Sequence, residues 1–172
     1  MSNLIFVDMK TIKLLATFVF LVSSSSIAFS SIPQTNKKDS LAIAVKQAVT
    51  SKHFKFVASF AYPSGGQAKY LTPDYELKVL GDTTTSYLPF FGRAYSVPYG
   101  GSDGGIKFTS TKSEYAYKQS KKGGFDITIN TQDTPEKYVI FISVAPSGSA
   151  SLTVLSNNRE SMRFSGTLEP TN

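Results

Sequence analysis

The feature that most constrains the fold is a hydrophobic period of two residues that recurs along the chain in short runs. In the first run, FKFVASFAY (residues 54–62), apolar side chains alternate with Lys55, Val57 and Ser59. Such alternation is typical of a strand with one face in a core and the other in solvent. It places on one face Phe54, Phe56, Ala58, Phe60 and Tyr62. Further runs of this kind lie at 74–80, 106–110, 125–130, 152–155 and 162–168, and another ends at Phe91.

Tight-turn sequences separate these runs. They are Gly81-Asp82, Lys122-Gly123-Gly124, Pro146-Ser147-Gly148 and Asn157-Asn158. Short strands joined by tight turns pair antiparallel. The run at 138–145, YVIFISVA, is apolar on both faces and predicts a central strand or one covered by a helix.

One segment changes to a helical period. In DSLAIAVKQAVTSK (39–52) apolar residues share one face, and Asp39 or Ser40 can cap the first turn. The face consists of Leu41, Ala44, Val45, Ala48 and Val49. We therefore predict a mainly β (α+β) fold, with one N-terminal helix packed on an antiparallel sheet of about eight strands that forms a barrel or a two-sheet sandwich.

An apolar leader precedes this domain. The stretch from Met9 to Val22 begins with lysines and has an apolar run too short to span a bilayer comfortably, which is typical of a signal peptide. Ala28 and Ser30 put small residues at the positions that a signal peptidase reads. We expect a signal peptide over residues 1–30, cleaved after Ser30.

The leader sets the domain boundaries. Either Met1 or Met9 could be the first residue of the signal. Residues 31–38, SIPQTNKK, are polar and predict a flexible lead-in. Residues 39–172 predict a single β-rich domain.

The absence of cysteine and the scattered distribution of charge restrict the expected cellular location and the kinds of partner. The chain has no cysteine, so it lacks both disulfides and the acylated thiol of a bacterial lipoprotein. We expect a periplasmic or extracellular protein that is not a lipoprotein and has no transmembrane anchor after cleavage. The net charge is +6, but the lysines are scattered rather than gathered in a stripe, so no nucleic-acid partner is predicted.

The residue types also restrict the chemistry. With His53 as the single histidine and no cysteine, nucleophilic triads and His- or thiolate-rich metal sites are not expected. Asp74, Glu76 and Asp126 fit the solvent side of amphipathic strands. We predict no catalytic, cofactor-binding or metal-binding residue and no cofactor.

The connection YLPFFGRAYSVPYGGSDGGIKF (87–108) is the strongest candidate for a binding site. Pro98 and the glycine pairs interrupt regular structure, and long loops in compact domains are often functional. Ile106 stands where a phosphate-binding loop needs lysine, so the glycines do not predict a phosphate site.

The aromatic residues of this connection predict that its first half folds back over one end of the sheet. Arg93 would then stack on a tyrosine or pair with a carboxylate, or it would face a ligand anion. Any ligand or partner contacts are placed at Arg93, Tyr95 and Tyr99.

Several blocks together resemble a known family. They are YLTPDY (70–75), YLPFFGRAY (87–95), GGIKFTS (104–110), KKGGF (121–125) and the closing MRFSGTL. In order and spacing, from about Leu41 to the C-terminus, the chain resembles the bacterial domain of unknown function family numbered 4251, exported proteins of Gram-negative envelope bacteria. The resemblance implies an envelope location and one β-rich domain, and it supplies no catalytic residues. Many relatives look like lipoproteins, whereas this chain lacks the required cysteine.

Three functions remain open. The first is an exported, non-catalytic β-domain that binds or scaffolds an unknown envelope protein or small ligand. The second is a lipocalin-like carrier with an apolar ligand in the barrel. The third is a carboxylate-based enzyme that would use residues such as Asp74, Glu76, Asp103 or Asp126.

Overall fold

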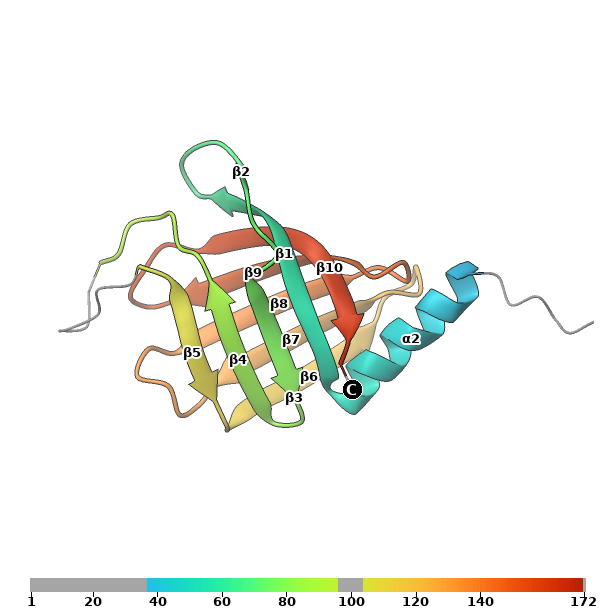
Figure 1. Cartoon of the computed structure of the whole chain (residues 1–172). Helices are drawn as coiled ribbons and strands as arrows, with labels where there is room; N and C mark the ends of the chain where they lie inside the picture. Colours follow the sequence, from blue (N-terminus) through green and yellow to red (C-terminus); the bar gives the residue numbers. More distant parts are fainter. Residues whose placement is uncertain (1–36, 96–103, 172) are drawn as a thin grey trace, which may run out of the picture. The chain divides into compact units, whose positions relative to one another are not determined.

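The computed structural model describes residues 37–95 and 104–171, and it shows one helix followed by ten strands (Figure 1). The expected signal peptide and most of the expected lead-in lie outside the described residues. The elements are α2 (Lys37–Ser51), β1 (His53–Pro63), β2 (Lys69–Tyr70), β3 (Glu76–Leu80), β4 (Thr83–Leu88), β5 (Ile106–Ser110), β6 (Ser113–Gln119), β7 (Phe125–Thr131), β8 (Tyr138–Val144), β9 (Ser149–Ser156) and β10 (Met162–Pro170).

The strands form one antiparallel sheet in the order β5-β4-β3-β1-β10-β9-β8-β7-β6, with β2 added beside β1. The sheet curls until β3, β4 and β5 cross in front of β7, β8 and β9 (Figure 1). It is therefore nearly closed into a barrel, and the two strands at the ends of the order, β5 and β6, leave it open. The prediction of a mainly β fold with one helix is confirmed, and the barrel replaces the sandwich alternative.

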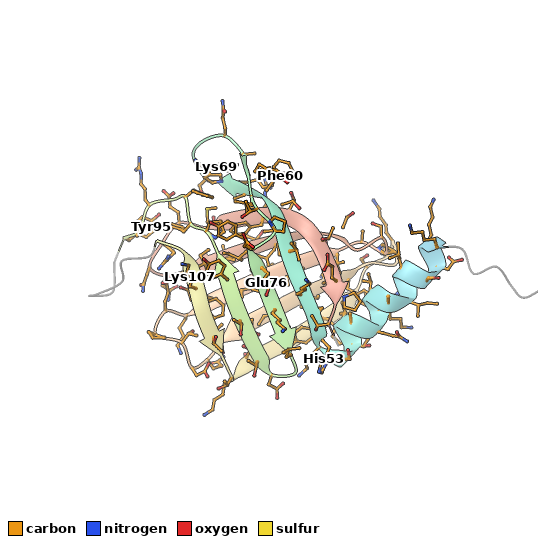
Figure 2. The ribbon with its side chains drawn as sticks, viewed as in Figure 1. His53, Phe60, Lys69, Glu76, Tyr95 and Lys107 are labelled. Atoms are coloured by element: carbon orange, nitrogen blue, oxygen red, sulfur yellow. The ribbon has the colours of Figure 1, made fainter. Side chains whose placement is uncertain are left out.

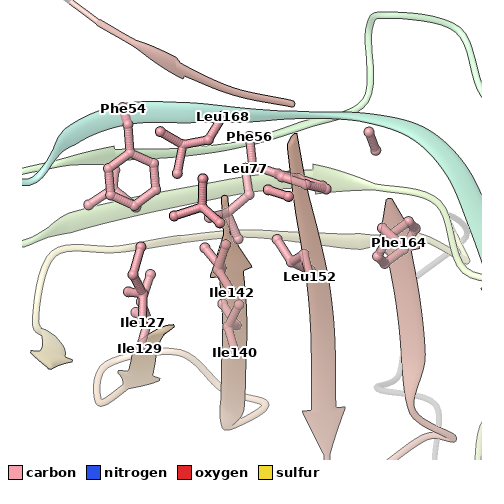
Figure 3. Packing of buried hydrophobic residues seen from close by; sticks show 14 of the residues in the cluster. Phe54, Phe56, Leu77, Ile127, Ile129, Ile140, Ile142, Leu152, Phe164 and Leu168 are labelled. Atoms are coloured by element: carbon pink, nitrogen blue, oxygen red, sulfur yellow. The ribbon is translucent and has the colours of Figure 1, made fainter. Parts of the chain in front are cut away.

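Side chains fill the interior of the barrel. Alternate residues of β7 and β8 point inward, as the period of two predicts, and meet phenylalanines and leucines from the opposite strands (Figure 3). The largest fully buried side chains include Phe54, Phe56, Leu77, Ile127, Ile140, Ile142, Leu152 and Phe164. The burial of these apolar side chains is the main stabilising contribution to the fold.

A β-bulge interrupts the alternation in β1. The register with β10 shifts between Ala58 and Phe60, so that Ser59 is an extra residue on this strand. After the bulge Ala61 points inward and is fully buried, whereas Phe60 is 40% exposed. The predicted inward positions of Phe60 and Tyr62 are therefore wrong, because one extra residue moves every later side chain to the other face.

Helix α2 packs against β1 and β10 through Val45, Ala48 and Val49, which are buried. The helix begins at Lys37, two residues earlier than predicted. Leu41 was expected on the buried face but is 42% exposed. The helix ends at Ser51, and Lys52 takes a left-handed conformation with φ of 58° before β1 begins.

Strand β8 confirms one of its two predicted alternatives. It is central, between β7 and β9, but the helix covers β1 and β10 instead. The outward-facing Phe141 is consequently 43% exposed.

Candidate functional site

Three connections meet at one end of the barrel: the segment after β1, the segment after β4 and the β9–β10 turn. Tyr95 N–H donates to the Asn158 carbonyl at 2.8 Å, and Glu160 N–H donates to the Arg93 carbonyl at 3.0 Å. Ser64 Oγ donates to the Ser161 carbonyl at 3.1 Å. The bonds of Arg93 and Tyr95 confirm the predicted fold-back of the long connection as far as Tyr95.

A pocket of about 470 Å³ lies between the three connections. Its walls are formed by Ser64, Gly65, Phe91, Gly92, Arg93 and Glu160. A side chain at position 92 would crowd the pocket, since a Cβ there would lie 2.9 Å from the Phe90 ring and 3.0 Å from Glu160 Oε2, so one of these side chains would have to shift. The same Glu160 oxygen accepts a hydrogen bond from Arg93 N–H at 3.1 Å and so fixes the backbone beside the pocket.

The predicted contact residues are placed unequally. Arg93 lines the pocket and is exposed, and within the described ranges its guanidinium makes neither of the structural contacts that we considered, a tyrosine ring or a carboxylate. Tyr95 is 71% exposed and lies at the edge of the same end (Figure 2). Tyr99 falls outside the described residues.

Exposed aromatic rings flank the pocket. Phe91 is 38% exposed, and Lys69 Nζ lies 4.8 Å from its ring centroid. On β2, Tyr70 is 75% exposed and packs edge-on against Phe60, with 5.5 Å between centroids. Figure 2 shows Phe60 and Lys69 together beside the β2 hairpin. Cationic and aromatic groups therefore occur side by side at this end of the barrel.

A buried ion pair between Arg159 and Glu136 lies next to the long connection. Arg159 Nε donates to Glu136 Oε1 at 2.9 Å, and a terminal guanidinium nitrogen of Arg159 donates to Glu136 Oε2 at 2.7 Å. Tyr138 Oη donates to Oε2 at 2.8 Å, and Ser156 Oγ donates to Oε1. The carboxylate is thus fully satisfied, which a buried charge requires.

The ion pair sets the charge state of its members. Burial raises the pKa of Glu136, but hydrogen bonds from Ser156, Arg159 and Tyr138 outweigh it, and the net pKa lies below its ordinary value. Burial raises the pKa of Tyr138, and the Glu136 carboxylate raises it further. Glu136 is therefore ionised and Tyr138 neutral at physiological pH.

Arg159 also joins the two ends of the long connection. Its guanidinium lies 5.1 Å from the ring centroid of Phe90, at the start of the connection. The second terminal nitrogen of Arg159 donates to the Gly105 carbonyl at 3.1 Å, just before β5. The ion pair therefore anchors the long connection at Phe90 and at Gly105, and neither Arg159 nor Glu136 lines the pocket.

A second polar cluster pins the β5–β6 turn. The Asp133 carboxylate accepts hydrogen bonds from Ser110 Oγ, from Thr111 N–H at 2.9 Å and from Thr111 Oγ1 at 2.8 Å. These bonds hold the pKa of Asp133 well below its usual range. The cluster ties the end of β5 to the β7–β8 connection.

Of the carboxylates considered for an enzyme, Glu76 and Asp126 are not brought together. Glu76 lies on β3 and Asp126 on β7, and four strands separate β3 from β7 in the sheet. Each alternates with inward-pointing residues, so each points away from the core. Asp103 lies outside the described residues.

The described interior also bears on the carrier hypothesis. Three pockets in the described part of the chain are lined mainly by loop residues or by outward-facing strand residues such as Phe141 and Thr153. The inward-facing residues form a packed core. The structure therefore offers more support for binding at the surface than for a ligand inside the barrel.

The described part of the chain offers neither a cluster of metal ligands nor a membrane-spanning helix. Within residues 37–95 and 104–171, no three His, Cys, Asp or Glu side chains are grouped closely enough to hold a metal ion. Helix α2, the helix in the described part of the chain, is not long and apolar enough to cross a membrane.

The residues that matter most for this end were not found from the sequence. Glu136 and Arg159 are 23 residues apart, and each follows a turn-like stretch that gives no sign of pairing. Glu160 stands beside Arg159 in the same turn. Only the fold brings these side chains to Phe90 and Gly105.

Comparison with known proteins gives a family and a fold. The chain matches the family model "Domain of unknown function (DUF4251)" over residues 36–168. A crystal structure of a DUF4251 family protein from Bacteroides eggerthii DSM 20697, at 1.95 Å resolution, superposes with a TM-score of 0.58 at 20% identity. The match covers 76% of this chain and 88% of that one, and at this identity it shows the shared fold alone. No curated protein matches the chain.

Proposed function

The chain belongs to the DUF4251 family of domains of unknown function, and we propose that it is an exported, non-catalytic domain that binds a ligand or partner in the bacterial cell envelope. One observation carries the binding role: Arg93 and Phe91 line an open pocket of about 470 Å³ whose backbone is held by hydrogen bonds between Arg93 and Glu160. Sites positioned by a rigid second layer of contacts are typical of binding surfaces.

The chemistry of the pocket indicates the kind of group that it binds. The Arg93 guanidinium offers a planar set of donors that suits a carboxylate or another oxyanion. Phe91 offers an apolar face in the same pocket, and Glu160, whose Oε2 accepts a hydrogen bond from Arg93 N–H, adds an acceptor. The proposed ligand group is therefore an anion attached to an apolar or ring-shaped part, carried by a small molecule or an envelope protein.

Capture from envelope extract tests this site. The tagged full-length chain should co-purify with its ligand or partner, identified by native mass spectrometry, and Arg93→Ala should weaken retention by about 10- to 100-fold. Arg163→Ala is the control, because Arg163 is another exposed arginine, it packs on Tyr62, and it does not line this pocket.

The outcomes separate a binding role from a structural one. Loss of the partner in Arg93→Ala, with an unchanged melting temperature and with retention in Arg163→Ala, supports the site. Equal retention by both variants contradicts it. Enzyme-like turnover of an ester, glycoside or peptide substrate would contradict the non-catalytic assignment.

Export is the second part of the proposal, and it depends on the leader. The apolar run from Met9 to Val22 and the small residues Ala28 and Ser30 favour cleavage before Ser31. N-terminal sequencing of the protein recovered from the envelope should therefore begin at Ser31. A membrane-bound form that keeps residues 14–22 would refute export by cleavage.

A further inference from the structure

Strand β6 is one end of the sheet order and has a free edge. It pairs with β7 over its whole length, Ser113 to Gln119, and in the described sheet it has no strand on its other side. Its residues from Ala116 to Gln119 are exposed. An edge of this length without proline presents unpaired N–H and C=O groups that favour pairing with another strand.

Hydrogen bonds at both ends of the β6–β7 ladder show which groups face outward. Ser120 N–H donates to the Gly124 carbonyl at 2.8 Å, and Gln132 N–H donates to the Lys112 carbonyl at 3.1 Å. Because bonded and non-bonded pairs alternate in an antiparallel ladder, the even-numbered residues of β6 bond to β7. The N–H and C=O groups of Tyr115, Tyr117 and Gln119 therefore point away from the sheet.

The start of the strand agrees with this alternation. Ser113 is also odd-numbered, and its N–H points away from β7 to the Asp82 carbonyl at 3.3 Å, in the β3–β4 turn. That turn covers the first position of the edge. The open part of the edge consequently runs from Tyr115 to Gln119.

The sequence of this edge is complementary to itself. Around Ala116 the residues read Glu114-Tyr115-Ala116-Tyr117-Lys118, with an acid and a base at equal distances from the centre. The charged residues lie on the outer face and the tyrosines on the inner one. In an antiparallel pair of two copies centred on Ala116, every acid would lie opposite a base.

We propose that two copies of this chain pair antiparallel through β6, with Ala116 on the two-fold axis, and join their sheets into one. Tyr115 and the partner's Tyr117 would exchange both backbone hydrogen bonds, and the symmetry repeats this exchange. Glu114 would lie opposite the partner's Lys118, where opposite charges in cross-strand pairs are stabilising. The contact is isologous and closes at two copies, so it forms a dimer and not a fibre.

The pairing of two copies also explains why the ring of Tyr117 is exposed in the single chain. The residue lies on the inner side of β6 next to Phe125, with 6.1 Å between ring centroids, yet it is 47% exposed. In the dimer, its ring and that of the partner's Tyr115 become neighbours across the new ladder. Aromatic cross-strand pairs of this kind stabilise antiparallel sheets.

Disulfide cross-linking tests the register, because the natural chain contains no cysteine. In the proposed dimer Ala116 forms a non-hydrogen-bonded pair with its own copy, at a Cα separation of about 4.5 Å. Ala116→Cys in the full-length chain should therefore form a covalent dimer on mild oxidation. Thr128→Cys is the matched control: Thr128 lies on β7 opposite Ala116, one strand further from the axis, so this variant should form no covalent dimer.

Sedimentation tests the pairing itself. The unmodified chain should be dimeric, and Lys118→Glu should weaken the dimer at least tenfold by placing two acids opposite each other. The exchanged pair Glu114→Lys with Lys118→Glu should restore it. Tyr117→Pro should abolish the dimer and keep the fold, because it removes an N–H group that faces away from β7.

Each result decides the proposal. A dimer that is lost with Lys118→Glu and regained with the exchanged pair supports it. A chain that is monomeric at every concentration, or that cross-links equally through Ala116→Cys and Thr128→Cys, overturns it. A dimer that is unchanged in both Lys118→Glu and Tyr117→Pro also overturns it, since the contact would then lie elsewhere.

Discussion

Replacing Arg159 by alanine will lower the free energy of unfolding by about 3 to 5 kcal/mol, the usual effect of breaking a buried ion pair. The loss is large because the Glu136 carboxylate stays buried after Arg159 is removed. Glu136 is 6% exposed, and without Arg159 its carboxylate keeps the bonds from Tyr138 and Ser156 but loses its counter-charge. Urea unfolding followed by circular dichroism measures the change.

Two control variants distinguish the effect of losing the Arg159 charge from the effect of losing the packing of its side chain. Arg163→Ala removes an exposed arginine that also stacks on a ring, and it should change stability by less than about 1 kcal/mol. Combining Glu136→Gln with Arg159→Met should recover part of the loss, because the uncompensated charge is gone. Equal losses in Arg159→Ala and Arg163→Ala would contradict a buried ion pair.

The pH dependence gives an independent check of the same pair. The pKa of Glu136 is lower in the folded state than its ordinary value of 4.5. Its contribution to stability is therefore complete above that value and is lost as the pH falls through the folded pKa. The difference in stability between the unmodified chain and Arg159→Ala should accordingly narrow in acid.

Gly166→Ala is expected to destabilise the protein by about 3 kcal/mol or more, as overpacking of a close contact does. Gly166 lies on β10 opposite Ala58, next to the bulge in β1. A Cβ built on Gly166 would lie 1.9 Å from the Val57 carbonyl oxygen and 3.1 Å from Ala58 Cα. Since backbone atoms fill this space, the two strands would have to separate.

Gly104→Ala is the matched control for this substitution. Nothing lies within 4 Å of a Cβ at Gly104, so the same chemical change should have little effect there. Thermal melts of the two variants provide the comparison. A melting temperature of Gly166→Ala equal to that of Gly104→Ala would show that β1 and β10 do not approach as closely as described.

The strand pattern predicted much of the fold because its signal is local. In β3 and β7 the alternation of Leu77 and Val79, or of Ile127 and Ile129, gives the buried face directly. Strand β6 was not predicted, because Ser113-Glu114-Tyr115-Ala116-Tyr117 lacks a strongly apolar face. This edge strand contributes only one partly buried hydrophobic side chain, Tyr115, and so carries a weak pattern.

Other features depend on contacts between distant parts of the chain. The bulge at Ser59 lies beside the close approach of β1 to Gly166, and no local residue predicts it. The exposed Leu41 belongs to the predicted helical face, but that end of α2 extends beyond β1 and β10. At the candidate site, Arg93 could be named from its loop, whereas Glu136 and Arg159 required the closed fold.

The β9–β10 turn, which holds the long connection through Asn158 and Arg159, has a consequence for how this fold can vary. Tyr95 is fixed by Asn158, and Gly105 is fixed by Arg159, so both anchors of the intervening stretch sit on one turn. Closing a longer loop between fixed points costs little, about 0.6 kcal/mol for each doubling of its length. Descendants of this chain could therefore lengthen, shorten or rewrite that stretch while the barrel persists, and an engineer could graft a foreign recognition loop between the same two anchors.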